Sequence, residues 1–593
     1  MKRISKVLCF LLTLVMLLGC VPAGITASAA GFNWTGSWGT PAIDSGVTLG
    51  DSQFKDVIPA NSTIRTIITP TLGGTKIRLK FSNLFGTSAM TINETTIANT
   101  GATDDLVDES TITQVTFNGG QKSVTIAAGS EVYSDEIAFK TTALKKVSVS
   151  TYFKKTTTMY TVGLYGGTTY LCSSLGNRTH KESMTTVATK LNFTSGTITY
   201  YTIPFLTRMD VYAQDSYCVV LLGDSTLTNE LYLMLAEKLN ANGVKNVGVV
   251  MSGIIGNELL NDGTGLLGTV YGQALLTRAK RDAFNVAGVK YVILKIGVND
   301  VLHPMLKSNE GMAQTTPSQI INGYKQLAQQ IKDTDVKMYL CTRTPYKGYT
   351  RNFMGSDDLE WSQKGENMLL EINSWVKNLS TDYGYAGYIN LDAVRDPDDS
   401  AKLRSHMTAD CVHFTQYGQI AVTDLIPEAA YGVNKELKDY ASILNIDPYT
   451  APKTTETTTK KQTAATTTNS NADNADSGTA ETTTVAQNNN ANVILPADTE
   501  TTTFNSVVVT PETTTENANQ IFVDDQQNDN GLVGSVSDDS NSSMKQMAGF
   551  AILATVAMAI IAVAAVMLAR LSPSASAPLA RGRGGRAKQK KRV

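Results

Sequence analysis

The chain has 593 residues, which is too long for a single hydrophobic core, and 42% of them are hydrophobic. With 51 basic and 53 acidic residues the net charge is −2, so nothing points to a polyanionic partner and nucleic-acid binding is not expected. The composition changes along the chain, and this predicts two folded domains together with accessory segments.

The N-terminal segment has the parts of a secretory signal. Three basic residues within the first six positions precede an apolar stretch over residues 7–18, and small residues follow it. The sequence therefore predicts a signal peptide over residues 1–29 and a mature chain from about Ala30. A lipoprotein-type box at residues 17–20 is the alternative, and it would leave Cys20 lipidated.

The next segment, residues 30–214, contains many short β-rich stretches separated by turn residues and no strong helical pattern. Examples are Thr75–Lys80, Val115–Phe117, Ser123–Ile126, Lys146–Tyr152 and Thr197–Thr202. This pattern is typical of an antiparallel β-sandwich or jelly roll. Its role stays open between a packing module and a carbohydrate-binding face or wall of an active site, because a fold alone does not give a function.

From residue 215 to 435 strand and helix patterns alternate. The strand candidates are Cys218–Leu222, Val247–Met251, Tyr291–Ile296, Lys337–Cys341 and Tyr388–Leu391. The helix candidates are Leu231–Leu239, Ala274–Phe284, Ile320–Ile331 and Met368–Leu379, with a final helix from about Thr415. Repeated strand-helix-strand units require a parallel sheet with helices on both faces. The sequence therefore predicts a three-layer α/β domain, whose ligands bind at the carboxyl ends of the strands.

The C-terminal part is predicted to be a stalk, a membrane span and a tail. Residues 436–546 form a linker, which is rich in Thr and Asn and disordered from about residue 451. Residues 547–569 are an uncharged apolar run, and about 20 such residues cross a bilayer as a helix. The basic residues of 570–593 predict a cytoplasmic tail. We therefore expect a single-pass protein of the cell membrane with its folded domains outside the cell.

Four cysteines lie beyond the signal region: Cys172, Cys218, Cys341 and Cys411. Their spacings resemble no metal site, and we expect neither a metal nor a cofactor. Four cysteines allow three pairings, and the sequence does not choose among them. Cys218 and Cys341 lie in apolar strand-like runs, where a small buried thiol is the simplest interpretation.

Polar residues follow several of the predicted strands. The first strand ends at Ser225, Gly256 and Asn299 follow the second and third, and Asp410 and His413 precede the last helix. A serine hydroxyl becomes a nucleophile when a histidine takes its proton, and the histidine needs an acid partner. Acyl transfer also needs donors for the oxyanion. Each residue alone has a plainer interpretation, as a turn or a helix cap, but together they match acyl-transfer chemistry.

The chain has only four histidines, so the alternatives to His413 as the base are few. His303 follows the third predicted strand, but it lacks an acid at turn spacing. His180 lies in the β-rich segment and His406 in a polar loop, where ordinary surface histidines are expected.

With these blocks in this order, residues 215–435 resemble the SGNH hydrolases, also called GDSL esterases and lipases, which have a flavodoxin-like fold. The resemblance implies that Ser225 is the nucleophile, that His413 is the general base, and that Asp410 orients His413. It also implies an oxyanion hole made by the amides of Ser225 and Gly256 and the side chain of Asn299. The β-rich segment resembles the leading domain of secreted bacterial members.

Two positions depart from the family pattern. Thr226 follows the serine where the family has Leu or Ile, and Phe414 follows the histidine where Pro is frequent. Neither residue is one of the implied catalytic groups, so the departures concern substrate preference more than activity.

The expected function is that of a serine esterase, which hydrolyses acyl esters through an acyl-enzyme intermediate. O-acetyl groups on an extracellular polysaccharide are the favoured substrate, because the stalk suits work on polymers. A lipase or general carboxylesterase has the same triad and is the first alternative. A non-catalytic glycan-binding surface protein is the alternative of another class, whereas a metal-dependent phosphoesterase lacks the ligands. The oligomeric state stays open.

Overall fold

The computed structural model describes residues 31–45, 57–184, 189–195, 198–228, 230–263, 265–351, 357–379 and 383–452. All of them belong to one compact unit, Met1–Thr463. The predicted signal peptide, membrane span and tail lie outside the described residues, and so does the stalk beyond residue 452. None of the helices in the described ranges is both long and apolar enough to cross a membrane.

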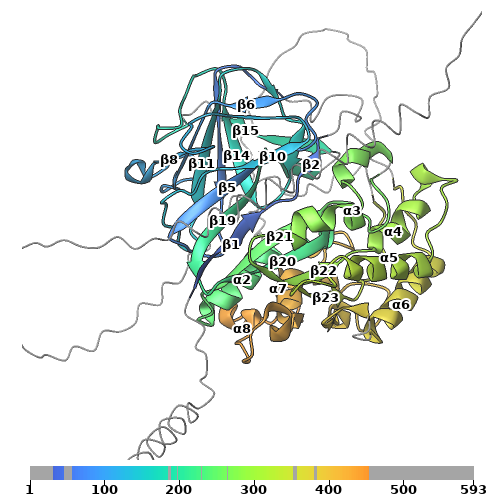
Figure 1. The fold of residues 1–593 in the computed structure, drawn as a ribbon. Helices are drawn as coiled ribbons and strands as arrows, with labels where there is room; N and C mark the ends of the chain where they lie inside the picture. The colour runs from blue at the N-terminus through green and yellow to red at the C-terminus, as the bar shows by residue number, and fades with distance from the viewer. Residues whose placement is uncertain are drawn as a thin grey trace, which may run out of the picture. The chain divides into compact units, whose positions relative to one another are not determined.

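The described residues up to 214, here called the β region, form antiparallel strands (Figure 1). The strands are β1 (Phe32–Gly39), β2 (Ile43–Asp44), β3 (Val57–Ile58), β4 (Ser62–Ile68), β5 (Lys76–Asn83), β6 (Met90–Ile92), β7 (Glu94–Asn99), β8 (Thr113–Val115), β9 (Val124–Ile126), β10 (Ser130–Tyr133), β11 (Val147–Phe153), β12 (Thr157–Thr158), β13 (Thr161–Gly163), β14 (Gly167–Cys172), β15 (Thr189–Lys190), β16 (Asn192–Ser195), β17 (Ile198–Tyr201), β18 (Ile203–Pro204) and β19 (Leu206–Gln214). The one helical turn described in this region is the 3-10 turn η1 (Glu109–Thr111).

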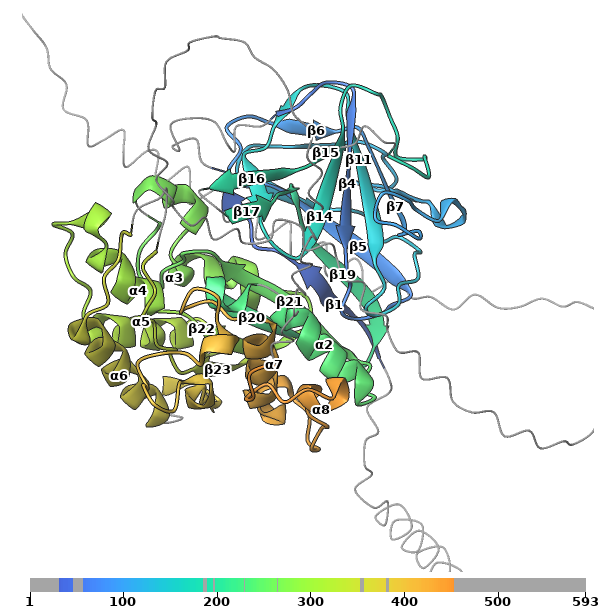
Figure 2. The same ribbon diagram turned by 180° about the vertical axis from the view of Figure 1, so that it is seen from behind.

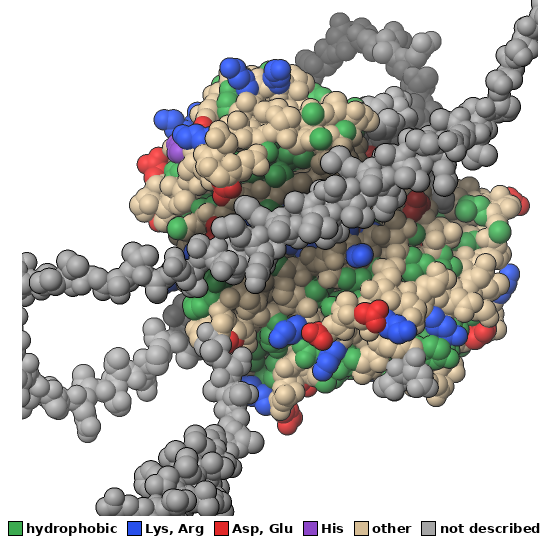
Figure 3. Space-filling model, viewed as in Figure 1, with side chains coloured by type: hydrophobic (Ala, Val, Ile, Leu, Met, Phe, Trp, Pro, Cys, Tyr) green, Lys and Arg blue, Asp and Glu red, His purple; other side chains and the backbone are tan. Residues whose placement is uncertain are grey.

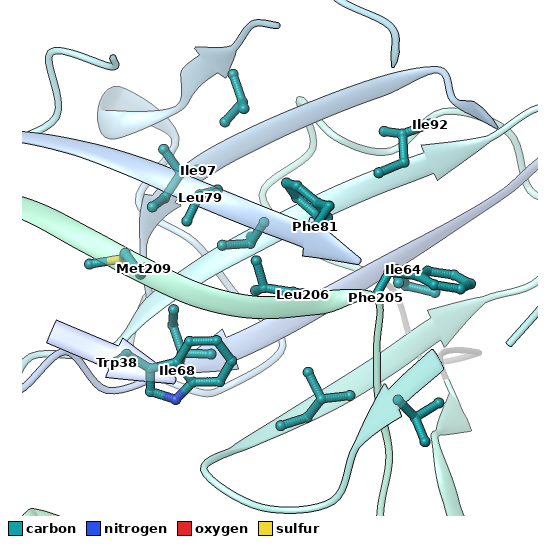
Figure 4. Close-up of a cluster of buried hydrophobic side chains, with 14 of the residues drawn as sticks. Trp38, Ile64, Ile68, Leu79, Phe81, Ile92, Ile97, Phe205, Leu206 and Met209 are labelled. Carbon is teal, nitrogen blue, oxygen red and sulfur yellow. The ribbon is translucent and has the colours of Figure 1, made fainter. Parts of the chain in front are cut away.

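Two larger sheets enclose the core of the β region. One has the order β1-β19-β5-β10 and the other β15-β14-β4-β11-β7-β8. Leu79 and Phe81 of β5 and Met209 of β19 gather with Ile64 and Ile68 of β4, and all five are at most 2% exposed (Figure 4). Alternate residues of each strand point inward, which is why the short β-rich stretches of the sequence fold as paired layers.

Residues from 217 onward, here called the α/β region, contain one parallel sheet. Its strands are β20 (Tyr217–Asp224), β21 (Val247–Ile254), β22 (Val289–Lys295), β23 (Lys337–Cys341) and β24 (Gly387–Ile389). Its helices are α2 (Leu231–Ala241), α3 (Leu275–Ala279), α4 (Val298–Leu302), α5 (Pro317–Gln329), α6 (Gln363–Lys377), α7 (Gln416–Leu425) and α8 (Tyr440–Leu444). The sheet order β21-β20-β22-β23-β24 is the flavodoxin-like one, in which ligands bind at the carboxyl ends of the strands next to the first strand.

Helices cover both faces of the sheet (Figures 1 and 2). On β20, Val220 and Leu222 pack with α3, α5 and α6, whereas Val219 and Leu221 pack with α2 and α7. A strand buried on both sides reads as a continuous apolar run, which is the pattern that the sequence showed. The predicted parallel sheet and three layers are therefore present.

Several predicted boundaries were wrong. The helices expected at Ile320–Ile331 and Met368–Leu379 are α5 (Pro317–Gln329) and α6 (Gln363–Lys377). The helix expected at Ala274–Phe284 is α3 followed by the π-helical turn η4 (Lys280–Phe284), where the amide of Asn285 donates to the carbonyl of Lys280 at 2.9 Å. The strand expected at Tyr388–Leu391 ends at Ile389. The stretch Val115–Phe117 leaves β8 after Val115, because Phe117 instead forms a bridge with Gln121.

The edge strand of the parallel sheet, β21, is covered by β1 of the β region. A Cβ on Gly248 would lie 2.1 Å from the carbonyl oxygen of Gly36, so the two backbones approach closely only because residue 248 is glycine. The amide of Val249 donates to Thr71 Oγ1 at 2.8 Å, and the amide of Gly36 donates to the carbonyl of Ala287 at 2.9 Å. The contact with Thr71 satisfies a backbone group of the edge strand that would otherwise stay unpaired.

Candidate active site

The predicted nucleophile, Ser225, lies directly after β20, the first strand of the parallel sheet in chain order, and opens the 3-10 turn η2 (Ser225–Leu227). Asp224 caps this turn, since its Oδ1 accepts from the amide of Thr226 at 2.9 Å and from Thr226 Oγ1 at 2.6 Å. Gly223 precedes them, and a Cβ there would lie 1.9 Å from the carbonyl oxygen of Lys295. The sequence Gly-Asp-Ser-Thr therefore ends the strand tightly and presents the serine hydroxyl at the edge of the sheet.

Ser225, His413 and Asp410 form a continuous hydrogen-bonded chain. His413 Nε2 lies 2.8 Å from Ser225 Oγ, although the two residues are 188 positions apart. His413 Nδ1 lies 2.6 Å from Asp410 Oδ2. Asp410 Oδ1 also accepts from the amides of Val412 and His413, at 3.0 and 2.8 Å. The structure thus brings together the three residues that the sequence predicted.

The surroundings of Asp410 favour its ionised form. Partial burial raises the pKa of the carboxyl, but the hydrogen bond and charge of His413 and the two backbone amides outweigh it, so the pKa lies below its ordinary value. A carboxylate that stays ionised holds a proton on Nδ1 of His413 and leaves Nε2 free to accept one. The chain of contacts therefore has the polarity that proton transfer from Ser225 requires.

The two remaining predicted site residues follow the neighbouring strands. Gly256 has a φ of +63°, and a Cβ there would lie 2.2 Å from the ring of Tyr271, so only glycine fits. Asn299 Nδ2 donates to the carbonyl of Asn257 at 3.0 Å. Within the described residues the second N–H of that amide has no partner, so it is available to a substrate oxygen. The structure thus ties Asn299 to the loop that contains Gly256.

A carboxylate fixes these two loops to each other. Asp300 accepts from the amides of Leu259 and Leu260, at 2.9 and 3.0 Å. Burial and the neighbouring charge of Glu258 raise the pKa of Asp300 to about 7, against the opposing effect of the two amides. Asn299 and Gly256, the predicted oxyanion donors, therefore lie on two loops that the hydrogen bonds of Asp300 join to each other.

Arg278 is a buried residue of the site that sequence reasoning missed. Its guanidinium donates to the carbonyl of Gly223 at 2.7 Å, to the carbonyl of Ser252 at 3.1 Å and to Asn257 Oδ1 at 3.0 Å. Its hydrogen bonds thus join the carboxyl ends of β20 and β21, close to Ser225 in the chain. The only signal in the sequence was a basic residue within an apolar helical pattern.

His303 has an acid partner that the sequence did not predict. Its Nδ1 lies 2.7 Å from Glu258 Oε1, both side chains are buried, and the imidazole stacks on Tyr271 with centroids 5.1 Å apart. The partner comes from another strand end, which is why turn spacing could not reveal it. The other two histidines are elsewhere, with His180 bonded to Glu94 and His406 to the carbonyl of Pro448.

In the part of the chain that the structure describes, no group of three or more His, Cys, Asp or Glu side chains is arranged to hold a metal. The sequence allowed three disulfide pairings of Cys172, Cys218, Cys341 and Cys411. In the structure all four are free thiols, and the first three are buried. Acidic and basic side chains are intermixed on the face shown in Figure 3, without a large patch of one sign.

A cavity of about 290 Å³ lies between the β region and helix α2. Its lining is Ile67, Thr69, Asp104, Lys146, Leu164, Tyr165, Gly166, Gly167, Thr168, Tyr201, Glu230, Tyr232 and Leu233. Lys146 and Asp104 form an ion pair of 2.8 Å at this lining. The cavity therefore combines tyrosine rings with charged and hydroxyl groups, and none of the predicted site residues belongs to its lining.

Comparisons with known proteins give the following matches. Residues 211–426 match the protein family described as GDSL-like lipase/acylhydrolase. Similar solved structures include an acetyl xylan esterase, AlAXEase, with 20% identity and a TM-score of 0.27 over 36% of this chain and 98% of that one. A GDSL-like lipase from Bacteroides thetaiotaomicron has 18% identity and a TM-score of 0.26 over 36% and 87%. A mutant acetyl-xylooligosaccharide esterase from Geobacillus has 14% identity and a TM-score of 0.28 over 37% and 95%. The search of curated proteins gave no match.

Proposed function

Since residues 211–426 are a GDSL-like lipase/acylhydrolase domain and the protein is a carboxylic ester hydrolase, we propose that it removes acyl groups by a Ser225-His413-Asp410 triad. The observation that carries this proposal is the unbroken chain from Ser225 Oγ through His413 to Asp410, with distances of 2.8 and 2.6 Å. A serine that is bonded to a histidine, which is bonded in turn to a carboxylate, is the arrangement that activates the hydroxyl.

The reaction takes place in two halves. His413 Nε2 takes the proton of Ser225 Oγ as the oxygen attacks the ester carbonyl, and it then gives that proton to the departing alcohol. Water, activated by the same nitrogen, next attacks the acyl-enzyme and releases the acid and the free serine. Asp410 keeps the imidazole in its tautomer and stabilises the imidazolium in both halves.

The oxyanion of each tetrahedral intermediate receives hydrogen bonds from the amides of Ser225 and Gly256 and from Asn299 Nδ2. These donors are held before the substrate arrives, because Asn299 is anchored on Asn257 and Asp300 braces the two loops. Donors that need no rearrangement are worth most in the transition state.

Asn299→Ala should lower kcat by about 10²–10³-fold and change KM little, because the amide acts on the developing oxyanion more than on the ground state. Steady-state hydrolysis of 4-nitrophenyl acetate measures both constants. Asn378→Ala, in an exposed asparagine at the end of α6, is the matched control and should keep the wild-type constants. An unchanged kcat with only KM altered would argue against the oxyanion role.

For the natural substrate we propose O-acetyl groups on a polysaccharide outside the cell. The Thr- and Asn-rich segment over residues 436–546, predicted to be a stalk, supports this choice, because a long flexible linker lets an enzyme reach an extended polymer. The predicted signal peptide over 1–29 and span over 547–569 agree with an outward-facing enzyme on a stalk.

The substrate is tested by acetate release from acetylated xylan, acetylated pectin, O-acetylated peptidoglycan and triacetin. We expect one of the polysaccharides to give a kcat/KM at least about tenfold above that of triacetin. A higher value for triacetin, or for longer triglycerides, would favour the lipase alternative. Binding of a glycan without release of any acid would favour the non-catalytic alternative.

A further inference from the structure

Lys295 is a buried charged residue that the proposed mechanism does not use. It is the last residue of β22, it lies beside Gly223 in the sheet register, and it is 1% exposed. Among the described residues its ammonium has no carboxylate within 4.0 Å. A buried ammonium is costly unless it is hydrogen-bonded, so its few contacts must explain its presence.

These contacts involve the neighbours in sequence of Ser225 and of His413. Lys295 Nζ donates to Thr226 Oγ1, which in turn donates to Asp224 Oδ1 at 2.6 Å. The same ammonium lies 5.8 Å from the centroid of the Phe414 ring. Thr226 follows Ser225 in the chain, and Phe414 follows His413. One side chain therefore donates to the residue after the predicted nucleophile and lies within cation–π range of the residue after the predicted base.

The two residues that Lys295 contacts are the two that depart from the family pattern. A leucine at position 226 would place methyl groups against the ammonium instead of a hydroxyl, and a proline at position 414 would offer no aromatic face. Thr226 and Phe414 thus supply the hydrogen-bond acceptor and the ring that a lysine at position 295 needs. The three residues form a matched set.

We propose that Lys295 is a positioning residue which couples the nucleophile turn to the histidine loop through Thr226 and Phe414. This inference rests on the proposed function, because it assumes that Ser225 and His413 react together. The ammonium holds the turn through the Thr226 hydroxyl, and it holds the loop through the ring of Phe414. With both segments held by one side chain, the distance between Ser225 Oγ and His413 Nε2 varies less than it would without Lys295.

The first test compares Lys295→Met with the wild-type protein. Methionine fills a similar volume but neither donates nor carries charge. We expect kcat for 4-nitrophenyl acetate to fall by about 10–100-fold with KM changed less than about threefold, because a small misplacement of reacting groups is costly. Lys238→Met is the matched control. Lys238, on α2, is equally buried but forms an ion pair with Asp424 of α7 at 3.1 Å. This variant should lower the melting temperature and leave kcat of the folded protein unchanged.

Two further variants keep the test valid if Lys295→Met does not fold. Thr226→Val removes the hydroxyl and Phe414→Leu removes the ring, and each should lower kcat by about 3–30-fold with little change in KM. In the double variant Thr226→Val/Lys295→Met the loss should be smaller than the product of the two single losses, because each single change already breaks the Lys295–Thr226 hydrogen bond. Multiplying losses, or a folded Lys295→Met with wild-type kcat, would overturn the proposal.

The failure of this proposal is distinct from that of the triad. If Ser225→Ala keeps the wild-type rate, the proposed function itself fails. If Ser225→Ala is inactive and Lys295→Met is folded and fully active, the triad stands and the positioning role falls.

The pH dependence of stability reports on the same ammonium. Burial lowers the pKa of Lys295 from 10.5 to about 8, with Asp224 opposing this shift and Arg343 adding to it, while the Cys341 thiol also lies nearby. Between these two pH values the unfolded chain binds more protons than the folded one, so this group makes the free energy of unfolding rise with pH. The difference between wild type and Lys295→Met should therefore grow in favour of wild type from about pH 8 to about pH 10.5. Parallel curves would show that the ammonium is not held in the buried position that the proposal requires.

Discussion

Replacing Ser225 with alanine should lower kcat for acyl-ester hydrolysis by about 10⁶-fold, which is the loss seen when a triad nucleophile acts as one unit with its base. Among the described residues this hydroxyl is the only oxygen that His413 Nε2 contacts, at 2.8 Å, so without it no acyl-enzyme forms. Steady-state hydrolysis of 4-nitrophenyl acetate measures the loss. Labelling by a fluorophosphonate, which reacts with activated serines, should disappear together with the activity.

Ser374→Ala is the matched control for this variant. Ser374 is an exposed serine on α6, and its replacement should leave both the rate and the labelling unchanged. A clean preparation of Ser225→Ala that keeps the wild-type rate would refute the nucleophile assignment. Loss of labelling with retained hydrolysis would show that a second site performs the reaction.

The parallel sheet and the triad geometry were predictable because their determinants are local or topological. Strands buried on both faces appear as apolar runs, and the polar residue after each run lies at the carboxyl edge of the sheet. Asp410 and His413 are three positions apart, so one turn joins them. Ser225 meets them across 188 positions, because parallel strands place all their carboxyl ends on one side.

The supporting network was not predictable from the sequence. Lys295 and Arg278 appeared only as basic residues in apolar patterns, since their partners Thr226 and Gly223 are 69 and 55 positions away. The Glu258 partner of His303 comes from another strand end, 45 positions away. Pairing across loops depends on the three-dimensional register of strands, which composition and periodicity do not encode.

Helix boundaries were uncertain for a related reason. The sequence Ala274–Phe284 has a helical period throughout, but the structure changes from α3 to a π-helical turn within it. Arg278 and Asp282 meet there at 3.3 Å while Arg281 also pairs with Asp282 at 2.6 Å. Arg278 also donates to the carbonyls of Gly223 and Ser252, outside this segment, and the periodicity of the sequence does not reveal such contacts.

Arg278→Met should lower the free energy of unfolding by about 3–5 kcal/mol, the largest effect on stability that we expect in the α/β region. The fully buried guanidinium is the donor to the carbonyls of Gly223 and Ser252 and to Asn257 Oδ1. Methionine fills much of the space but takes this donor away from three buried acceptors, and a buried group left without a hydrogen bond costs about 1–3 kcal/mol. Urea denaturation followed by near-ultraviolet circular dichroism measures the change.

Arg281→Met is the control variant. It removes a cation next to Asp282 but keeps the hydrogen bonds of Arg278 to Gly223, Ser252 and Asn257. Arg281 also pairs with Asp282, at 2.6 Å, but it is 21% exposed and donates to neither strand end. Its replacement should cost about 1 kcal/mol, because Asp282 keeps Arg278 as a partner. If the two variants lose equal stability, the ion pair and not the fastening of β20 to β21 is what Arg278 supplies. If Arg278→Met loses much more unfolding free energy than Arg281→Met, the guanidinium stabilises the sheet. If its folded fraction also has a lowered kcat, the guanidinium also holds Asn257, to whose carbonyl Asn299 donates.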